Sequence, residues 1–269
     1  MCKHVFFMSA KQTFGDFMKI EMRDPNLKYP IAIRDEKITI ILDWLLEFRF
    51  SSVQILAMRL GQSVTNSNRF FNLMLKNNLI LSFKNVHTSN IRCYMLKSAG
   101  VDFLKSRGRD TTHSMTRVKW LGDYSKILHD LSVQNSILNR LEKFESLTWD
   151  KNIEKDLFVE RPDALMVLKE HGAMIALEYE RSRKDTKRIY YTFMNHIKAI
   201  QDKKVKAFFY DFQSEADMHF YRELFQKKEW PVIERDKKTG KARYLNKKID
   251  TEPFSDLKGS FVFNYSPFG

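Results

Sequence analysis

The sequence predicts an α+β protein whose first half is mainly helical and whose second half is a mixed sheet flanked by helices. Apolar residues recur at helical spacing between residues 35 and 75, and a strand, a polar loop and a strand follow between 79 and 96. Farther on, helical and strand-like segments alternate: we expect a helix over residues 120–144, a loop that leads to a strand over residues 149–158, and a long helix over residues 183–200. We expect five parts: an N-terminal extension (1–34), a first domain (35–105), a linker (106–119), a second domain (120–235) and a basic C-terminal tail (236–269).

The net charge of +13 is unevenly distributed along the chain. Residues 1–120 contain 19 lysines and arginines against 9 acidic residues, whereas residues 121–200 contain 13 of each kind. A basic first half joined to an acid-rich middle suits a protein that holds a polyanion in one part and acts on it in another. A merely soluble basic surface would give the same totals.

Composition also excludes several classes of protein. No apolar stretch reaches the ~18 residues that span a bilayer, so we expect no membrane insertion. Two cysteines are too few for a disulfide framework or a zinc site, and the reducing cytoplasm is the expected setting. A glycine-rich phosphate loop, as in ATP-driven motors, is missing, and the seven histidines lack the spacing of metal ligands.

The first domain has the order of elements of a winged helix-turn-helix. An apolar stripe over residues 38–46 predicts one helix. Ser51-Ser52 is the expected N-cap of a second helix, which Gly61 ends, and Ser63 is the expected cap of a third. Two short helices joined by a tight glycine turn, followed by a hairpin, are typical of this DNA-binding arrangement.

The third of these helices carries polar side chains on its outward face. Amides and a guanidinium there can bond base edges and phosphates in a major groove, and basic residues of the hairpin can contact phosphates. An ordinary polar helix face, or a winged helix used for protein contacts, is the alternative. The predicted DNA-binding residues are Thr65, Asn66, Asn68, Arg69, Asn72, Lys76, Lys84 and Arg92.

A predicted hairpin in the second domain brings three carboxylates together. Its strands, 165–168 and 173–180, are separated by a polar turn with a glycine. If residue 168 pairs with 173, Asp163 lies opposite Glu178 with Cβ atoms ~5 Å apart. Glu180 shares the face of Glu178, because side chains alternate along a strand. Converging carboxylates repel one another unless a cation lies between them, and Mg²⁺ or Mn²⁺ is the usual one. The alternative is a solvated strand end whose acids pair with nearby arginines.

Such a site could cleave a phosphodiester. Asp163 and Glu178 are the predicted metal ligands, and a metal-bound water is the expected nucleophile. His129 is a candidate further ligand, although a lone helical histidine more often serves packing. Glu180 could complete the ligand set or act as a base, and Glu154 could orient a water.

Two further residues are candidates for a catalytic role. Lys184 could neutralise charge on the phosphate. Tyr190, together with its neighbour Tyr191, is the alternative to water as the nucleophile, since a tyrosine hydroxyl can form a covalent intermediate.

The second domain resembles the PD-(D/E)xK nuclease fold, with Pro162-Asp163 as its first motif and Glu178-Tyr179-Glu180 as its second. Glu180 stands where that fold has lysine, and Lys184 is the candidate replacement, since migrated lysines are familiar there. A winged helix followed by R-P-D-A and A-L-E-Y-E-R-S-R-K, over roughly residues 35–212, resembles the replication-relaxation group, which includes the MOBC-type plasmid mobilization relaxases.

This resemblance implies a metal-dependent, site- and strand-specific DNA nickase that initiates conjugative mobilization at a plasmid transfer origin in the bacterial cytoplasm. It implies double-stranded and nicked or single-stranded DNA as the substrate, with an accessory mobilization protein and a coupling protein as partners. Two alternatives remain. One is a restriction- or repair-type endonuclease, and the other is a non-catalytic replication initiator or DNA-binding regulator that keeps the nuclease fold.

Overall fold

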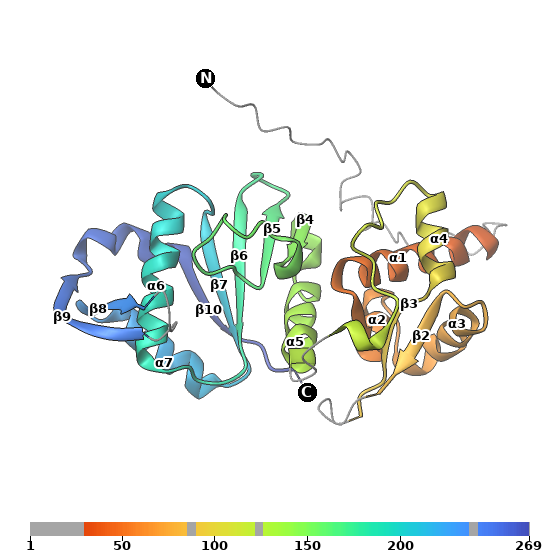
Figure 1. Ribbon diagram of the computed structural model, residues 1–269, viewed down its shortest axis with the longest axis horizontal. Coiled ribbons are helices and arrows are strands. Elements are labelled where there is room, and N and C mark those ends of the chain that lie inside the picture. Colours follow the sequence, from red (N-terminus) through yellow and green to blue (C-terminus); the bar gives the residue numbers. More distant parts are fainter. Residues whose placement is uncertain (1–29, 85–89, 122–125, 237–241, 269) are drawn as a thin grey trace, which may run out of the picture.

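The computed structural model describes residues 30–84, 90–121, 126–236 and 242–268 (Figure 1). It contains helices and a mixed sheet, which confirms the predicted α+β class. Most of the predicted N-terminal extension, residues 1–29, lies outside the described residues, as does the hairpin loop 85–89. Among the helices that are described, none is both long and apolar enough to cross a membrane.

The first half consists of four helices around a small antiparallel sheet with the strand order β1-β3-β2. The Ser52 side chain accepts a hydrogen bond from the Ile55 amide, and Ser63 caps the next helix in the same way. Gly61, between these helices, has a φ of +65°, so the predicted caps and glycine turn are confirmed. The elements are α1 (Pro30–Phe48), β1 (Phe50–Ser52), α2 (Val53–Arg59), α3 (Val64–Lys76), β2 (Ile80–Phe83), β3 (Cys93–Leu96) and α4 (Ser98–Ser106).

The second half is built on a five-stranded mixed sheet with the order β10-β7-β6-β5-β4. Neighbouring strands are antiparallel from β4 to β6 and parallel from β6 to β10. One helix covers one face, and two helices cover the other (Figure 1). The strands are β4 (Phe144–Trp149), β5 (Ala164–Leu168), β6 (Met174–Glu180), β7 (Ala207–Phe212) and β10 (Phe261–Tyr265); the helices are α5 (Ile127–Leu138), α6 (Thr186–Gln201) and α7 (Glu215–Gln226).

A second hairpin and four short 3-10 helices complete the chain that is described. The hairpin lies beside α6 and joins α7 to the last strand of the main sheet. These elements are β8 (Glu229–Arg235), β9 (Ala242–Asp250), η3 (Val118–Leu121), η5 (Leu141–Lys143), η6 (Asp150–Asn152) and η7 (Glu252–Ser260).

Several boundaries differ from those expected. The helix predicted over residues 120–144 is reduced to α5, and β4 follows it as an edge strand that pairs with β5. No strand leads up to residue 158, because the chain from 153 to 163 is irregular. The α6 helix begins at Thr186 with Asp185 as its N-cap, so Lys184 precedes the helix. The segment expected as a tail instead forms β9, η7 and β10, and β10 pairs in parallel with β7.

The two halves share one apolar cluster. This cluster runs from α1, α2 and β3 to α5 and to the face of the main sheet that α5 covers. At its centre the Trp44 indole donates to Gln134 Oε1 at 3.1 Å, and Gln134 Nε2 donates to the Phe50 carbonyl at 2.9 Å. Within the expected linker, Arg109 pairs with Asp43 of α1 at 3.1 Å. The first half is therefore packed directly against α5.

Candidate active site

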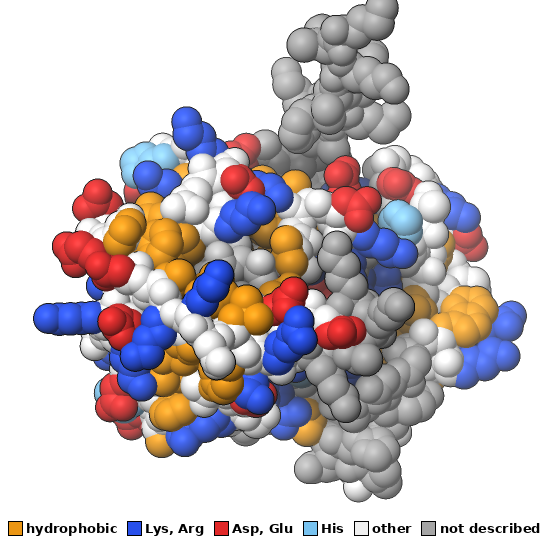
Figure 2. Space-filling view, turned by 60° about the vertical axis from the view of Figure 1, so that its left-hand side comes forward, with side chains coloured by type: hydrophobic (Ala, Val, Ile, Leu, Met, Phe, Trp, Pro, Cys, Tyr) orange, Lys and Arg blue, Asp and Glu red, His pale blue; other side chains and the backbone are white. Residues whose placement is uncertain are grey.

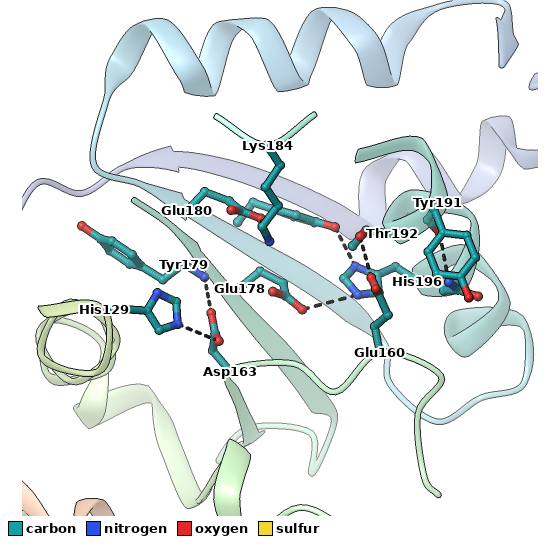
Figure 3. Close-up of polar contacts among 12 residues, drawn as sticks. His129, Glu160, Asp163, Glu178, Tyr179, Glu180, Lys184, Tyr191, Thr192 and His196 are labelled. Atoms are coloured by element: carbon teal, nitrogen blue, oxygen red, sulfur yellow. Dashed lines mark hydrogen bonds and ion pairs between the residues drawn. The ribbon is translucent and has the colours of Figure 1, made fainter. Parts of the chain in front are cut away.

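An open cleft of about 620 Å³ lies at the end of the β5–β6 hairpin. The Cα register pairs residues 164–167 with 177–174, as the sequence predicts, and Gly172 lies in the connecting turn with a φ of +61°. This register brings Asp163, just before β5, beside Glu178 and Glu180 at the end of β6 (Figure 3). The three predicted carboxylates therefore line one cleft.

Asp163 is fixed by two hydrogen bonds. Its Oδ1 atom lies 2.9 Å from His129 Nε2, and its Oδ2 atom accepts from the Tyr179 amide at 2.7 Å. Burial opposes the charge on Asp163, but the charge and hydrogen bond of His129 and the amide of Tyr179 together lower its pKa below the usual value. Burial likewise opposes a charged His129, yet Asp163 raises the pKa of that imidazole. The two residues form an ion pair at the edge of the cleft.

Glu178 and Glu180 point to the face of the sheet that α6 covers, and they are only 7% and 3% exposed. Burial, reinforced by the charge of Asp163, raises the pKa of Glu178 well above the usual value. Burial also raises the pKa of Glu180, although Glu180 Oε1 lies 2.5 Å from Lys184 Nζ. Burial opposes the charge on Lys184, but Glu180 and Glu178 raise its pKa, so its ammonium group stays charged.

Two side chains of α6 contact carboxylates of the cleft from behind. Thr192 donates to Glu160 Oε2 at 2.6 Å. One turn later, His196 Nε2 lies 3.4 Å from Glu178 Oε1. Glu160 and His196 are not among the residues predicted for the site. The available signal was the spacing of Thr192 and His196 by four residues, which places both on one helix face.

Basic side chains surround the acidic centre. They come from the start of α5, from the irregular segments before and after the hairpin, and from α6 and β8. Arginine binds phosphate oxygens with its planar fork of donors, so this rim is suited to the backbone of a nucleic acid. The basic residues that line the cleft, besides Lys184, are Lys126, Arg161, Arg181, Arg188 and Arg235.

Two predicted catalytic residues lie elsewhere. Tyr190 is only 3% exposed, and its ring packs 6.0 Å from that of Trp230, so it does not line the cleft. The side chain of Tyr190 faces the apolar core rather than the carboxylates. Glu154 is an exposed residue of the irregular segment after β4 and does not line the cleft either. Glu160, and not Glu154, is the carboxylate of this irregular segment that lines the cleft.

The predicted DNA-binding side chains are exposed, as expected. On α3, four of these side chains line a shallow depression of about 560 Å³, together with Lys37 and Phe70. The four are Asn66, Arg69, Asn72 and Lys76. Lys84 and Arg92 flank the hairpin loop. Figure 2, in which the second half comes forward, shows lysine and arginine side chains intermixed with acidic and hydrophobic ones among the residues that are coloured. The exposed residues are Thr65, Asn66, Asn68, Arg69, Asn72, Lys76, Lys84 and Arg92.

The donor set of the cleft fits a hard divalent cation such as Mg²⁺ or Mn²⁺, because its centre offers carboxylate oxygens. Among the described residues, no three acidic, histidine or cysteine side chains are already arranged to ligate an ion. Asp163 is turned toward His129, and Glu180 is turned toward Lys184. Burial first, and then the neighbouring charge of Asp163, raise the pKa of Glu178, so this carboxylate has an unfavourable free energy of ionisation in the cleft as it stands.

No model of a protein family, no curated protein and no solved structure matches this chain.

Proposed function

We propose that the protein is a divalent-metal-dependent DNA endonuclease that nicks one strand at a plasmid transfer origin. The observation that carries the proposal is the pairing of the buried Glu178 with the half-buried Asp163 in a cleft with a basic rim. The order α5-β4-β5-β6-α6-β7, with antiparallel β4–β6 and parallel β6–β7, supports a PD-(D/E)xK nuclease fold.

In this proposal Asp163 and Glu178 hold the ion, which when bound stabilises charge on the phosphate and lowers the pKa of a bound water. His129 keeps Asp163 ionised and oriented through its 2.9 Å contact. Lys184 supplies the positive charge that a PD-(D/E)xK nuclease usually has from a lysine at the position that Glu180 occupies here. Its contact with Glu180 supports this replacement, because Glu180 holds the ammonium group inside the cleft. The rim arginines bind the flanking phosphates.

We further propose that the first half is a winged helix that reads duplex DNA with α3. The order α1-β1-α2-α3-β2-β3, with β1 paired to β3, supports this arrangement. The exposed amides and Arg69 on α3 are the side chains that would meet base edges and phosphates. The cytoplasmic setting and the accessory mobilization and coupling proteins belong to the same proposal.

One observation favours a second candidate function. Glu180 occupies the position of the usual catalytic lysine, which suits a replication initiator or regulator that has kept the fold and lost the activity. A nicking assay separates the two. Supercoiled plasmid that carries the cognate origin should become open circular with Mg²⁺ or Mn²⁺ if the protein is a nickase. It should become linear with a restriction-type enzyme and should only shift in a gel with a regulator.

Substitutions test the site itself. Asp163→Ala and Glu178→Ala should abolish nicking and leave duplex binding intact. Glu223→Ala, which removes an exposed carboxylate of α7, is the matched control and should nick as the unaltered protein does. Persistent nicking by both cleft variants would refute the assignment of these carboxylates.

A further inference from the structure

A buried histidine–tyrosine pair lies directly behind Glu178. His196, on α6, is 1% exposed, and its ring stacks on that of Phe208 with 3.7 Å between centroids. Its Nδ1 atom lies 2.6 Å from the Tyr210 hydroxyl, and its Nε2 atom lies 3.4 Å from Glu178 Oε1 (Figure 3). Nε2 makes no hydrogen bond of normal geometry, so it is a buried polar atom aimed at the carboxylate.

The contacts determine which nitrogen of His196 carries the proton. His196 is enclosed by aromatic rings, where a neutral imidazole with one N–H group is favoured over a charged one. Burial raises the pKa of Tyr210 well above its usual value, so its hydroxyl keeps its proton. Within the part of the chain that the structure describes, that hydroxyl has Nδ1 as its hydrogen-bond partner. A hydroxyl that donates to Nδ1 leaves the proton on Nε2, facing Glu178.

Packing alone does not account for this pair. The surroundings of His196 are apolar and aromatic, and a leucine or phenylalanine would fill such a space without a polar atom to satisfy. Burying an imidazole without a full set of hydrogen bonds has an unfavourable free energy of transfer. The unfavourable burial is offset if Nε2 donates to a charged acceptor, and Glu178 is the acceptor within reach.

We propose that His196 is a positioning residue that, oriented by Tyr210, donates from Nε2 to Glu178 and fixes that carboxylate for the divalent cation. The inference rests on the proposed metal site. The α6 helix then supports two carboxylates of the cleft from one face, Glu178 through His196 and Glu160 through Thr192. Outer partners of this kind typically change metal affinity by about 10–100-fold when they are removed.

Two conservative substitutions distinguish a donor from a space-filling side chain. His196→Gln places an amide N–H group where Nε2 lies, whereas His196→Asn places one where Nδ1 lies. We expect the glutamine variant to bind Mn²⁺, measured by electron paramagnetic resonance, within about threefold of the unaltered protein, and the asparagine variant to bind about 10–100-fold more weakly. Thermal melts in EDTA report the effect on folding separately.

Tyr210→Phe provides a second variant that keeps the aromatic ring. It removes the hydroxyl that orients His196, so Mn²⁺ affinity should fall about tenfold. Unchanged Mn²⁺ affinity in His196→Asn and Tyr210→Phe would overturn the inference. The inference would also be overturned if the glutamine and asparagine variants lost Mn²⁺ affinity equally and in proportion to their loss of Tm. If the unaltered protein binds no Mn²⁺, the metal site itself fails and the inference fails with it.

Discussion

Glu178→Gln should stabilise the metal-free protein while it removes a ligand of the proposed metal site. The substitution keeps the shape of the side chain and removes a charge that burial and Asp163 both disfavour. In the absence of metal the unaltered protein must either ionise Glu178 in the cleft or keep it protonated at neutral pH, and each has a free-energy cost. Glutamine removes this cost.

The size of the effect depends on pH in a defined direction. Below the usual pKa of 4.5, Glu178 is protonated in both the folded and the unfolded chain. Its titration then contributes nothing to the difference in stability between the unaltered protein and Glu178→Gln. As the pH rises, the unfolded chain ionises first, and the unaltered protein loses stability until the pH passes the raised pKa of the folded state. Each unit of pKa difference corresponds to about 1.4 kcal/mol.

Stabilising replacements at functional sites commonly contribute about 0.5–2 kcal/mol. Because 1 kcal/mol shifts Tm by about 2–4 °C in a chain of about this size, we expect Glu178→Gln to raise Tm by about 1–8 °C at pH 8 in EDTA. The gain should shrink as the pH falls toward 4.5. A concentration of Mg²⁺ or Mn²⁺ at 100 times Kd should stabilise the unaltered protein by about 2.7 kcal/mol and leave the variant almost unchanged.

Differential scanning fluorimetry between pH 4 and pH 8, with and without metal, measures these differences. Glu223→Gln is the control, because it removes the same charge from the exposed side of α7, where surface substitutions stay within about 0.5 kcal/mol. A Glu178→Gln variant that melts below the unaltered protein at pH 8, or whose gain is independent of pH, would refute the electrostatic reasoning.

Substitutions at three other positions test the molecule outside the carboxylates of the cleft. Tyr190→Phe should keep nicking within about twofold, because Tyr190 packs on Trp230 outside the cleft; loss of nicking together with a covalent protein–DNA adduct would make it the nucleophile. Glu47→Ala should cost about 1–3 kcal/mol in urea unfolding, because it leaves the buried Trp149 amide without its acceptor, whereas Glu47→Gln keeps an acceptor and should cost less. Arg69→Ala should weaken duplex binding and lower the salt slope by about one; an unchanged slope would exclude α3 from the interface.

Local patterns predicted the parts of the fold that depend on short segments. The caps Ser52 and Ser63 and the turn at Gly172 are confirmed, because each depends on neighbouring residues only. The strand β4 was missed because a six-residue segment that follows a helical pattern has no periodicity of its own, and its pairing with β5 decides its structure. The strand β10 depends on a partner about fifty residues away, β7, which no local pattern identifies.

In the candidate site, too, the part that depends on neighbouring residues was predictable and the part that depends on distant ones was not. The hairpin register alone placed Asp163 beside Glu178, because pairing across a short turn fixes which residues lie opposite. The roles of Glu160 and His196 come from α6, which folds back on the sheet through contacts far apart in sequence. Tyr190 was misplaced for a related reason, since one helix carries both cleft-facing and core-facing side chains and the sequence does not show which face packs inward.

The shared core has a consequence for how binding and cutting are related. The Glu47 side chain of α1 accepts a hydrogen bond from the Trp149 amide at 2.8 Å. Asp150, which follows Trp149, lines the cleft, and its amide donates to the Asp163 carbonyl at 3.0 Å. The first half therefore supports the segment that carries a predicted metal ligand. If α3 binds duplex DNA as proposed, its position relative to the cleft is set by packing rather than by a free linker. The cut would then fall at a constant distance from the recognised sequence, as a strand-specific nickase requires.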